Sequence, residues 1–419
     1  MVTVLQDVIA TQKRDIEESL RAPYVERRVR ASALSPDMVT AILGPRRAGK
    51  SFFALHYLAS SGPFGYANFD DERLVQVDDY DQILAAIDVV YNRPRALLFD
   101  EIQNLPRWEL FVNRLQRQGC RLVLSGSNAH LLSGELATHL TGRHLPVVLL
   151  PFSFAEYVSA VATRGVQAES RELLVRYLSD GGFPEPLLRD VDRRTYLSTL
   201  LESTIYKDVV RRFKLRSARA IDDLMVYLLS NIATEMSPSA LAGVAGCRSH
   251  HTVEKYLGYL ERTLLLFRLP RFDYSVKKQM SHNKKIYCID NGYITSRGFS
   301  SSPNYGKLAE NLVAVCLKKR EMEGRASIYF WKNPEQEEVD FVVKEGPRVV
   351  SLIQVCWNVD SPRTHDREIR ALLKGARDLR CDDLIVLNES RDETEHAEWY
   401  GLKGDVKFVP LWEWLLAEA

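Results

Sequence analysis

The sequence has few cysteines, no membrane-length apolar run and no excess of one charge. Its six cysteines are scattered and form no C-x-x-C pair, which argues against a zinc site or a disulfide framework and favours reduced thiols. No apolar run approaches the ~20 residues of a membrane helix. The N-terminus lacks the charged-then-apolar order of a signal peptide. We therefore expect a cytoplasmic protein without a membrane partner.

The charges nearly cancel, because 56 Lys and Arg face 55 Asp and Glu, for a net charge of +1. Nothing in the overall charge attracts nucleic acid or a membrane, so any such binding must come from a local patch. An apolar content of 46% and a charged content of 26% are typical of a globular protein. A length of 419 residues predicts about two to four domains.

Residues 39–52 read VTAILGPRRAGKSF and contain the pattern G-x-x-x-x-G-K-S. An apolar strand, a glycine-bounded loop and a helix are the context of a phosphate-binding loop, whose backbone N–H groups face phosphate oxygens. Lys50 is expected to reach the β- and γ-phosphates of ATP, and Ser51 to hold Mg²⁺. The alternative is a chance glycine-rich turn. The predicted nucleotide-binding residues are Gly44, Pro45, Arg46, Arg47, Ala48, Gly49, Lys50, Ser51 and Phe52.

A second apolar strand, residues 96–99, is followed by Asp100 and Glu101. Two carboxylates after a buried strand, downstream of a phosphate-binding loop, indicate the acidic half of an ATP site. Asp100 is predicted to contact Mg²⁺, and Glu101 to orient and polarise the attacking water as general base. The alternative is an acidic turn at a strand end.

Further polar residues follow the next strand, which ends near Ser125. Asn128, then Ser127, then Ser125 are candidates to touch the γ-phosphate or the water; alternatively they cap the helix that follows. Arg143 is a candidate to stabilise phosphate charge in a neighbouring subunit, or it pairs with a surface carboxylate.

The remaining chain divides by pattern. Residues 1–36 are predicted to form a charged helical segment packed beside the core of residues 37–151, and residues 152–216 to form a helical lid. Residues 217–284 indicate a helix-turn-helix with a wing. Its basic residues include Arg248 and Lys255, so the segment either contacts DNA or packs between domains.

Residues 285–419 alternate strands and helices again. A metal-dependent nuclease of the restriction type needs an Asp, a second acid and a Lys two residues further on. Here Glu310 and Asp340 are present, but Gln354 stands at the acid position and Cys356 at the lysine position. We therefore interpret this region as a nuclease-like fold without nuclease chemistry.

Together these motifs resemble a known family, the archaeal and bacterial AAA+-type P-loop ATPases with a winged helix and a C-terminal restriction-endonuclease-like domain. The resemblance covers nearly the whole chain. It implies a parallel α/β core, ATP and Mg²⁺ at Gly44, Gly49, Lys50, Ser51 and Asp100, and hydrolysis through Glu101. It also implies a ring, with a hexamer favoured, in which an arginine completes the neighbour's site. The motifs are GPRRAGKS (44–51), NFDDERL (68–74), LLFDEIQN (97–104), LSGSNAHLLSGELATHLTGRH (124–144), GGFPE (181–185) and EVDFVV (338–343).

The functional prediction is a Mg²⁺-dependent ATP hydrolase coupled to binding or remodelling of DNA, with branched or junction DNA among the candidate substrates. The alternative is a nucleotide-gated switch that signals to a protein partner. A pure switch does not need the carboxylate of Glu101, so its presence favours hydrolysis. A DNA nuclease is the third hypothesis, which the residues at 354 and 356 oppose.

Overall fold

The computed structural model describes residues 2–30, 34–35, 37–126, 142–215, 217–247, 249–299 and 304–418. The chain forms two compact units, Met1–Pro151 and Phe152–Ala419. Within the part of the chain that the structure describes, every helix is too short or too polar to span a membrane. The predicted division into five domains stays a prediction.

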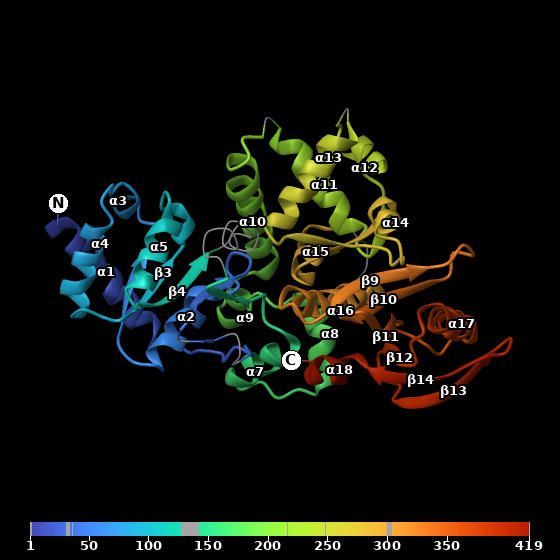
Figure 1. Cartoon of the computed structure of the whole chain (residues 1–419). Helices are drawn as coiled ribbons and strands as arrows, with labels where there is room; N and C mark the ends of the chain where they lie inside the picture. Colours follow the sequence, from blue (N-terminus) through green and yellow to red (C-terminus); the bar gives the residue numbers. More distant parts are fainter. Residues whose placement is uncertain are drawn as a thin grey trace. The chain divides into compact units, whose positions relative to one another are not determined.

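The first unit is built on a five-stranded sheet in which every described pairing is parallel, in the order β2-β3-β4-β1-β5 (Figure 1). The strands are β1 (Val39–Leu43), β2 (Phe64–Asn68), β3 (Ala96–Asp100), β4 (Arg121–Gly126) and β5 (His144–Val148). The helices are α1 (Val2–Ser19), α2 (Lys50–Ala59), α3 (Glu72–Val75), α4 (Asp81–Tyr91) and α5 (Trp108–Arg117), with the 3-10 turn η2 (Ile102–Asn104). The parallel α/β core predicted from the sequence is confirmed.

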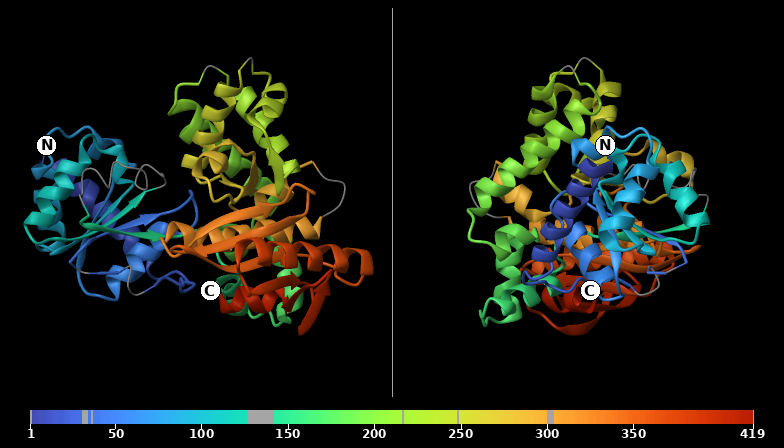
Figure 2. Two further views of the ribbon diagram at one scale, coloured as in Figure 1. Left: turned by 45° about the vertical axis from the view of Figure 1, so that its right-hand side comes forward. Right: turned by 90° about the vertical axis from the view of Figure 1, so that its left-hand side faces the viewer.

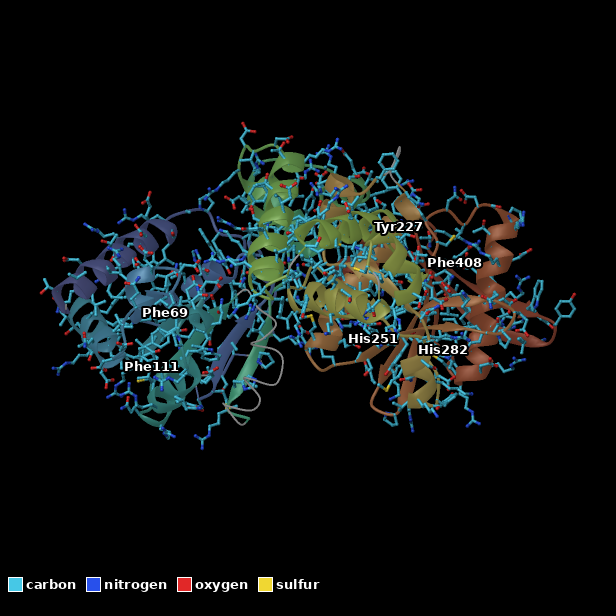
Figure 3. All side chains as sticks on the ribbon, turned by 90° about the horizontal axis from the view of Figure 1, so that it is seen from above. Phe69, Phe111, Tyr227, His251, His282 and Phe408 are labelled. Carbon is cyan, nitrogen blue, oxygen red and sulfur yellow. The ribbon has the colours of Figure 1, made fainter. Side chains whose placement is uncertain are left out.

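Alternating side chains of the strands fill two separate cores, one on each face of the sheet. Ala41 and Leu43 of β1 enter the core that contains Phe69 and Phe111, whereas Ile42 enters the core beneath α2. Figure 3 labels Phe69 and Phe111 among the side chains of this unit. The continuous apolar runs of the sequence are therefore strands buried on both faces.

The N-terminal segment differs from its predicted form. Helix α1 ends at Ser19, and residues 23–30 follow without helix or strand. The physical reason is Pro23, which disfavours helical geometry in the residue before it and lacks a backbone N–H. Helix α1 packs on α4 and β2, and it buries Val8 and Ile9 in the first core.

The second unit begins with helices, as the pattern predicts. Helix α8 ends at Asp180 and α9 begins at Pro184, so the glycines of residues 181–182 form the expected turn. The helices are α7 (Phe154–Thr163), α8 (Ser170–Asp180), α9 (Pro184–Leu188), α10 (Arg193–Thr204), which continues into a π-helical segment (Ile205–Arg211), and α11 (Ala218–Ser230).

A small helix-and-sheet module follows. Helix α11 precedes β6 (Thr234–Met236), helices α12 (Pro238–Val244) and α13 (His250–Arg262) come next, and β7 (Leu266–Leu269) and β8 (Lys284–Cys288) complete an antiparallel sheet in the order β6-β8-β7. The segment between β7 and β8 contains α14 (Val276–Ser281). The chain then reaches α15 (Asn291–Arg297).

The C-terminal sheet has six strands in the order β13-β14-β12-β11-β10-β9. It confirms the expected second sheet domain. Helix α17 (Pro362–Leu379) contacts β10, β11 and β14, and lies against this sheet in Figure 2. The elements are α16 (Tyr305–Met322), β9 (Ser327–Lys332), β10 (Glu338–Glu345), β11 (Arg348–Val355), α17, β12 (Leu384–Asn388), β13 (Glu393–Trp399), β14 (Leu402–Pro410) and α18 (Leu411–Ala417).

Candidate active site

The loop of residues 44–49 joins β1 to α2 and depends on its two glycines. Gly49 has φ +91°, a left-handed conformation that glycine adopts without strain. At Gly44 a Cβ atom would lie 1.9 Å from the carbonyl oxygen of Leu149, so no larger residue fits. The chain therefore turns tightly from the end of β1 into a helix whose first residue is Lys50.

Lys50 is held inside this loop. Its side chain is buried, with the residue 5% exposed, and Nζ donates to the carbonyl oxygen of Pro45 at 2.9 Å. Ala48 is fully buried, Ser51 is half-buried and Phe52 is 36% exposed. The ammonium is thus fixed at the N-terminus of α2, where the backbone N–H groups and the helix dipole favour anions.

Asp100 is the last residue of β3, is buried, and accepts hydrogen bonds from two hydroxyl groups. Ser125 of β4 donates to its Oδ1, and the phenol of Tyr66 of β2 donates to its Oδ2 at 3.3 Å. Burial, together with the negative charge of Asp100, raises the pKa of Tyr66 well above its ordinary value, so the phenol stays a donor. Ser125 was a candidate to touch phosphate; the structure instead places it against Asp100, fully buried.

Glu101 follows Asp100 in a left-handed conformation with φ +50°. A non-glycine residue in this region is uncommon, and here it begins the short turn η2. The carboxylate is half-buried and accepts a hydrogen bond from the side-chain amide of Gln103. The chain thus turns sharply at the residue predicted to act as general base.

The loop and the acidic pair lie at the same edge of the sheet. In the strand register, Ile42 of β1 is opposite Ser125 of β4, and Phe99 of β3 is opposite Leu124. The carboxyl ends of β1, β4 and β3 are therefore level. In open parallel sheets this edge is where ligands bind.

The donors at this edge fit a nucleotide-bound Mg²⁺. Mg²⁺ in phosphate sites takes one or two protein ligands and completes its shell with phosphate oxygens and water. The Ser51 hydroxyl and the Asp100 carboxylate would be such a set, because a carboxylate with two accepted hydrogen bonds still has lone pairs available. Among the described residues no group of three or more His, Cys, Asp or Glu side chains is arranged to hold a metal alone.

Arg143 lies at the opposite edge. It immediately precedes β5, whose first residue, His144, is opposite Val39, the first residue of β1. Its side chain is exposed, and its backbone carbonyl accepts from the amide of Val39 at 3.1 Å. Arg143 is therefore a full strand length from Gly44, and a role at its own loop is excluded by this position.

Sequence reasoning missed a buried arginine behind the loop. Arg27, only 8% exposed, donates from Nη1 to the carbonyl of Ala48 and from Nη2 to the carbonyl of Leu150, both at 2.6 Å. Three residues earlier, the ring of Tyr24 stacks on His56 of α2 at 3.9 Å between centroids. No sequence pattern distinguishes Arg27, because the arginine-rich segment around it is expected to be exposed to solvent.

Four other candidates complete the set. Asn128, Ser127 and Arg248 lie outside the described residues. Lys255 is exposed on α13, the helix on which Figure 3 labels His251.

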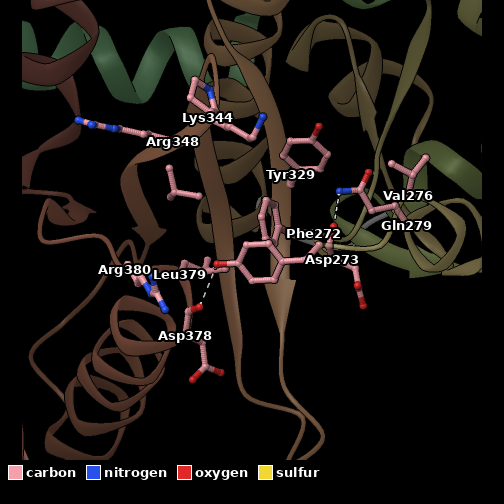
Figure 4. Close-up of a pocket in the computed structure, with 13 residues that line it drawn as sticks. Phe272, Asp273, Val276, Gln279, Tyr329, Lys344, Arg348, Asp378, Leu379 and Arg380 are labelled. Carbon is pink, nitrogen blue, oxygen red and sulfur yellow. Dashed lines mark hydrogen bonds between the residues drawn. The ribbon is translucent and has the colours of Figure 1, made fainter.

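The second unit contains a separate cavity of about 960 Å³. Figure 4 shows its wall, where Tyr274 donates to the backbone carbonyl of Asp378 at 3.2 Å. Basic side chains also line it, those of Lys344, Arg348 and Arg380. None of the residues predicted from the sequence lines this cavity, so it is not part of the nucleotide site.

Comparison with known proteins places this geometry in a family. Residues 36–158 match a family described as "AAA domain", while residues 171–301 and 305–414 match two domains of unknown function, DUF8612 and DUF4143. The uncharacterized protein MJ1544 of Methanocaldococcus jannaschii is 31% identical over 430 residues, covering 96% of this chain and 93% of that protein. The chain belongs to the MJ1544 family. Its N-terminal unit is an AAA-type P-loop domain.

Three further proteins are also similar to this MJ1544-family chain. An uncharacterized protein of Haemophilus influenzae is 27% identical over 351 residues, covering 79% of this chain and 85% of that protein. The Walker-type ATPase PABY2304 of Pyrococcus abyssi aligns with TM-score 0.42 and 15% identity (68% of this chain, 94% of that one). Cdc6p from Pyrobaculum aerophilum aligns with TM-score 0.28 and 12% identity (73% and 98%). Both TM-scores lie below 0.5, so the fold assignment rests on the sheet order and the AAA-domain match.

Proposed function

We propose that this member of the MJ1544 family is a Mg²⁺-dependent ATP hydrolase. The observation that carries the proposal is the meeting of two motifs at one sheet edge. Buried Lys50 follows β1, and the pair Asp100 and Glu101 follows β3, with only β4 between these strands. This is the arrangement that positions a triphosphate between a cation and a general base.

Each residue has a distinct task in this proposal. The loop amides and Lys50 bind the phosphates and offset the charge that develops on them. Ser51 and Asp100 hold Mg²⁺, which when bound neutralises phosphate charge. Tyr66 and Ser125 fix the carboxylate of Asp100. Glu101 orients the attacking water and accepts its proton, and Gln103 limits the rotation of Glu101.

The proposed assembly rests on the position of Arg143. An exposed arginine at the edge opposite the loop serves a nucleotide only in a neighbouring copy. We propose a homo-oligomer, with a hexameric ring favoured, in which Arg143 approaches the γ-phosphate of the next subunit.

The catalytic role of Glu101 is tested by steady-state ATP hydrolysis. We expect Glu101→Gln to lower kcat by about 10²- to 10⁴-fold, because the amide keeps the shape but does not accept the proton. Nucleotide affinity should stay unchanged, since Lys50 and the loop are intact. Asp88→Asn, an exposed carboxylate on α4, is the control and should turn over like wild type. Equal turnover in wild type and Glu101→Gln would refute hydrolysis through this residue.

We further propose that turnover is coupled to DNA through α13. The order α11, β6, α12, α13, β7, β8 with sheet order β6-β8-β7 supports a winged helix. On α13 the acids Glu254 and Glu261 are both paired with Arg268 of β7, each at 2.7 Å. With these acids offset, the exposed Lys255 leaves a positive charge on the helix surface.

The DNA proposal predicts a salt-dependent effect. In the double variant Arg248→Ala, Lys255→Ala we expect affinity for DNA to fall roughly tenfold and the slope of log K against log salt to decrease by about two. Lys403→Ala, an exposed lysine of β14 paired with Glu398, should change neither. Duplex, single-stranded and four-way-junction DNA are compared in the same assay. Turnover indifferent to every DNA form would favour the alternative, a nucleotide-gated switch acting on a protein partner.

A further inference from the structure

One buried lysine in the second unit is surrounded by acids. Nζ of Lys285, on β8, lies 2.8 Å from Glu310 of α16, 2.7 Å from Glu338 and 3.1 Å from Asp340, both of β10. Its side chain is only 4% exposed. Three carboxylates thus contact one ammonium inside the protein, and two of them, those of Glu310 and Asp340, accept hydrogen bonds from it.

The groups around this cluster are neutral or already bonded. Oδ2 of Asp340 accepts from the amide of Val355 at 3.0 Å, and the amide of Asp340 donates to the side-chain oxygen of Gln354 at 3.1 Å. The nitrogen of the same Gln354 amide donates to the buried carboxylate of Glu368. A glutamate at position 354 would remove the donor to Glu368 and place a second carboxylate against it, so the glutamine suits this network better than a metal-binding acid.

Position 356 supplies no cation. Burial, and next the charge of Glu368, raise the pKa of the Cys356 thiol to about 12, so it stays neutral. The positive charge that the sequence appeared to lack comes from Lys285. It lies on β8, distant in sequence from positions 354 and 356 at the end of β11.

The charge state of the cluster agrees with this picture. Burial lowers the pKa of Lys285, but the attraction of Glu310, Asp340 and Glu338 outweighs it, and the pKa ends well above the ordinary value. For Glu310, burial and then the charge of Asp340 raise the pKa to about 7. The lysine is therefore charged at neutral pH.

We propose that Glu310, Glu338 and Asp340 form a cation site whose cation is the ammonium of Lys285, and that Lys285 excludes the divalent metal which a nuclease would hold there. A divalent ion would need the same oxygens that Nζ contacts at 2.7–3.1 Å, so both cannot bind. In the described part of the chain no group of three or more His, Cys, Asp or Glu side chains is arranged to hold a metal, so with Lys285 in place the structure shows no metal site here. The lysine also ties the β6-β8-β7 sheet to the C-terminal sheet.

Mn²⁺ binding to the full, nucleotide-free chain tests this, measured by electron paramagnetic resonance with and without Asp340→Asn. Wild type should show no Mn²⁺ uptake that depends on Asp340. Lys285→Met should gain one Mn²⁺ per chain, and Lys285→Met with Asp340→Asn should lose it again. Lys332→Met is the control, because Lys332 contacts Glu235 at 3.1 Å and Glu338 only at 3.8 Å; it should gain no site.

Two outcomes would overturn the proposal: Asp340-dependent Mn²⁺ uptake by wild type, or a folded Lys285→Met chain that binds none. Three buried acids without their lysine could prevent folding. In that case Lys285→Met with Glu338→Gln, which retains Glu310 and Asp340, replaces the single variant. The wild-type measurement can overturn the proposal in either case, since the P-loop site does not contain Asp340.

Discussion

In the Gly44→Ala variant, nucleotide affinity should fall by at least about 100-fold. A displacement of about 1 Å in a site can have an effect of this size. A single methyl group is sufficient, because the added Cβ would lie 1.9 Å from the carbonyl oxygen of Leu149 and 3.0 Å from its carbon. Neither neighbour is a flexible side chain, so backbone has to move. The strands that would separate are β1 and the end of β5, which are hydrogen-bonded from Leu149 to Leu43 at 2.7 Å.

The same substitution should destabilise the AAA-type unit by about 2–4 kcal/mol, the range of severe overpacking. The measurement is binding of a fluorescent ATP analogue, together with urea unfolding. Gly243→Ala provides a matched control in helix α12, where an added Cβ meets nothing within 4 Å. It should bind nucleotide like wild type and gain up to about 1 kcal/mol from helix propensity. Normal nucleotide affinity in Gly44→Ala would show that the loop does not need this close approach.

The parts of the site that can be predicted from the sequence are those formed by residues close together in the chain. The loop of residues 44–51 carries its own strand and helix, and Asp100 with Glu101 directly ends an apolar strand. Such motifs can be recognised from local spacing, because the strand and helix that position their residues are adjacent to them in the sequence. For the same reason the order of strands and helices, and the turn before α9, are read correctly.

What the sequence does not reveal are partners brought together by the sheet. Tyr66 meets Asp100 across 34 positions, Lys285 meets Asp340 across 55, and Arg27 meets Leu150 across 123. Each is a common residue type with no local signal. From the sequence alone, a lysine is expected to be exposed to solvent and a tyrosine to pack in the core. Only the folded chain shows that this lysine is surrounded by carboxylates and that this tyrosine donates to a buried acid.

The extent of the N-terminal helix was also misjudged for a physical reason. Charged residues continue past Ser19, and periodicity alone extends the helix over them. Pro23 prevents the helix from continuing, and the chain beyond it brings Arg27 to the phosphate loop. The segment that was interpreted as a solvated helix thus contributes a buried side chain to the site's support.

Arg27→Met should loosen the phosphate loop without touching the nucleotide. The guanidinium bridges the carbonyl of Ala48, within the loop, to the carbonyl of Leu150, which follows β5. Methionine fills the volume but donates nothing, so two buried carbonyls lose their partner, at a cost of about 1–3 kcal/mol each. We expect ATP affinity to fall roughly tenfold or more, since the loop amides then lose their fixed orientation. Hydrogen exchange at residues 44–51 should accelerate.

Two further variants separate geometry from charge. Arg27→Lys keeps the positive charge but carries a single compact ammonium, which does not span two carbonyls as a planar fork does. If bridging matters, Arg27→Lys should resemble Arg27→Met; if the charge near the phosphates matters, it should resemble wild type. Arg30→Met removes an exposed arginine of the same segment and should leave both affinity and exchange unchanged. Unaltered hydrogen exchange at the loop in Arg27→Met would mean that the strands alone fix the loop conformation. The buried arginine would then only attach residues 23–30 to the rest of the unit.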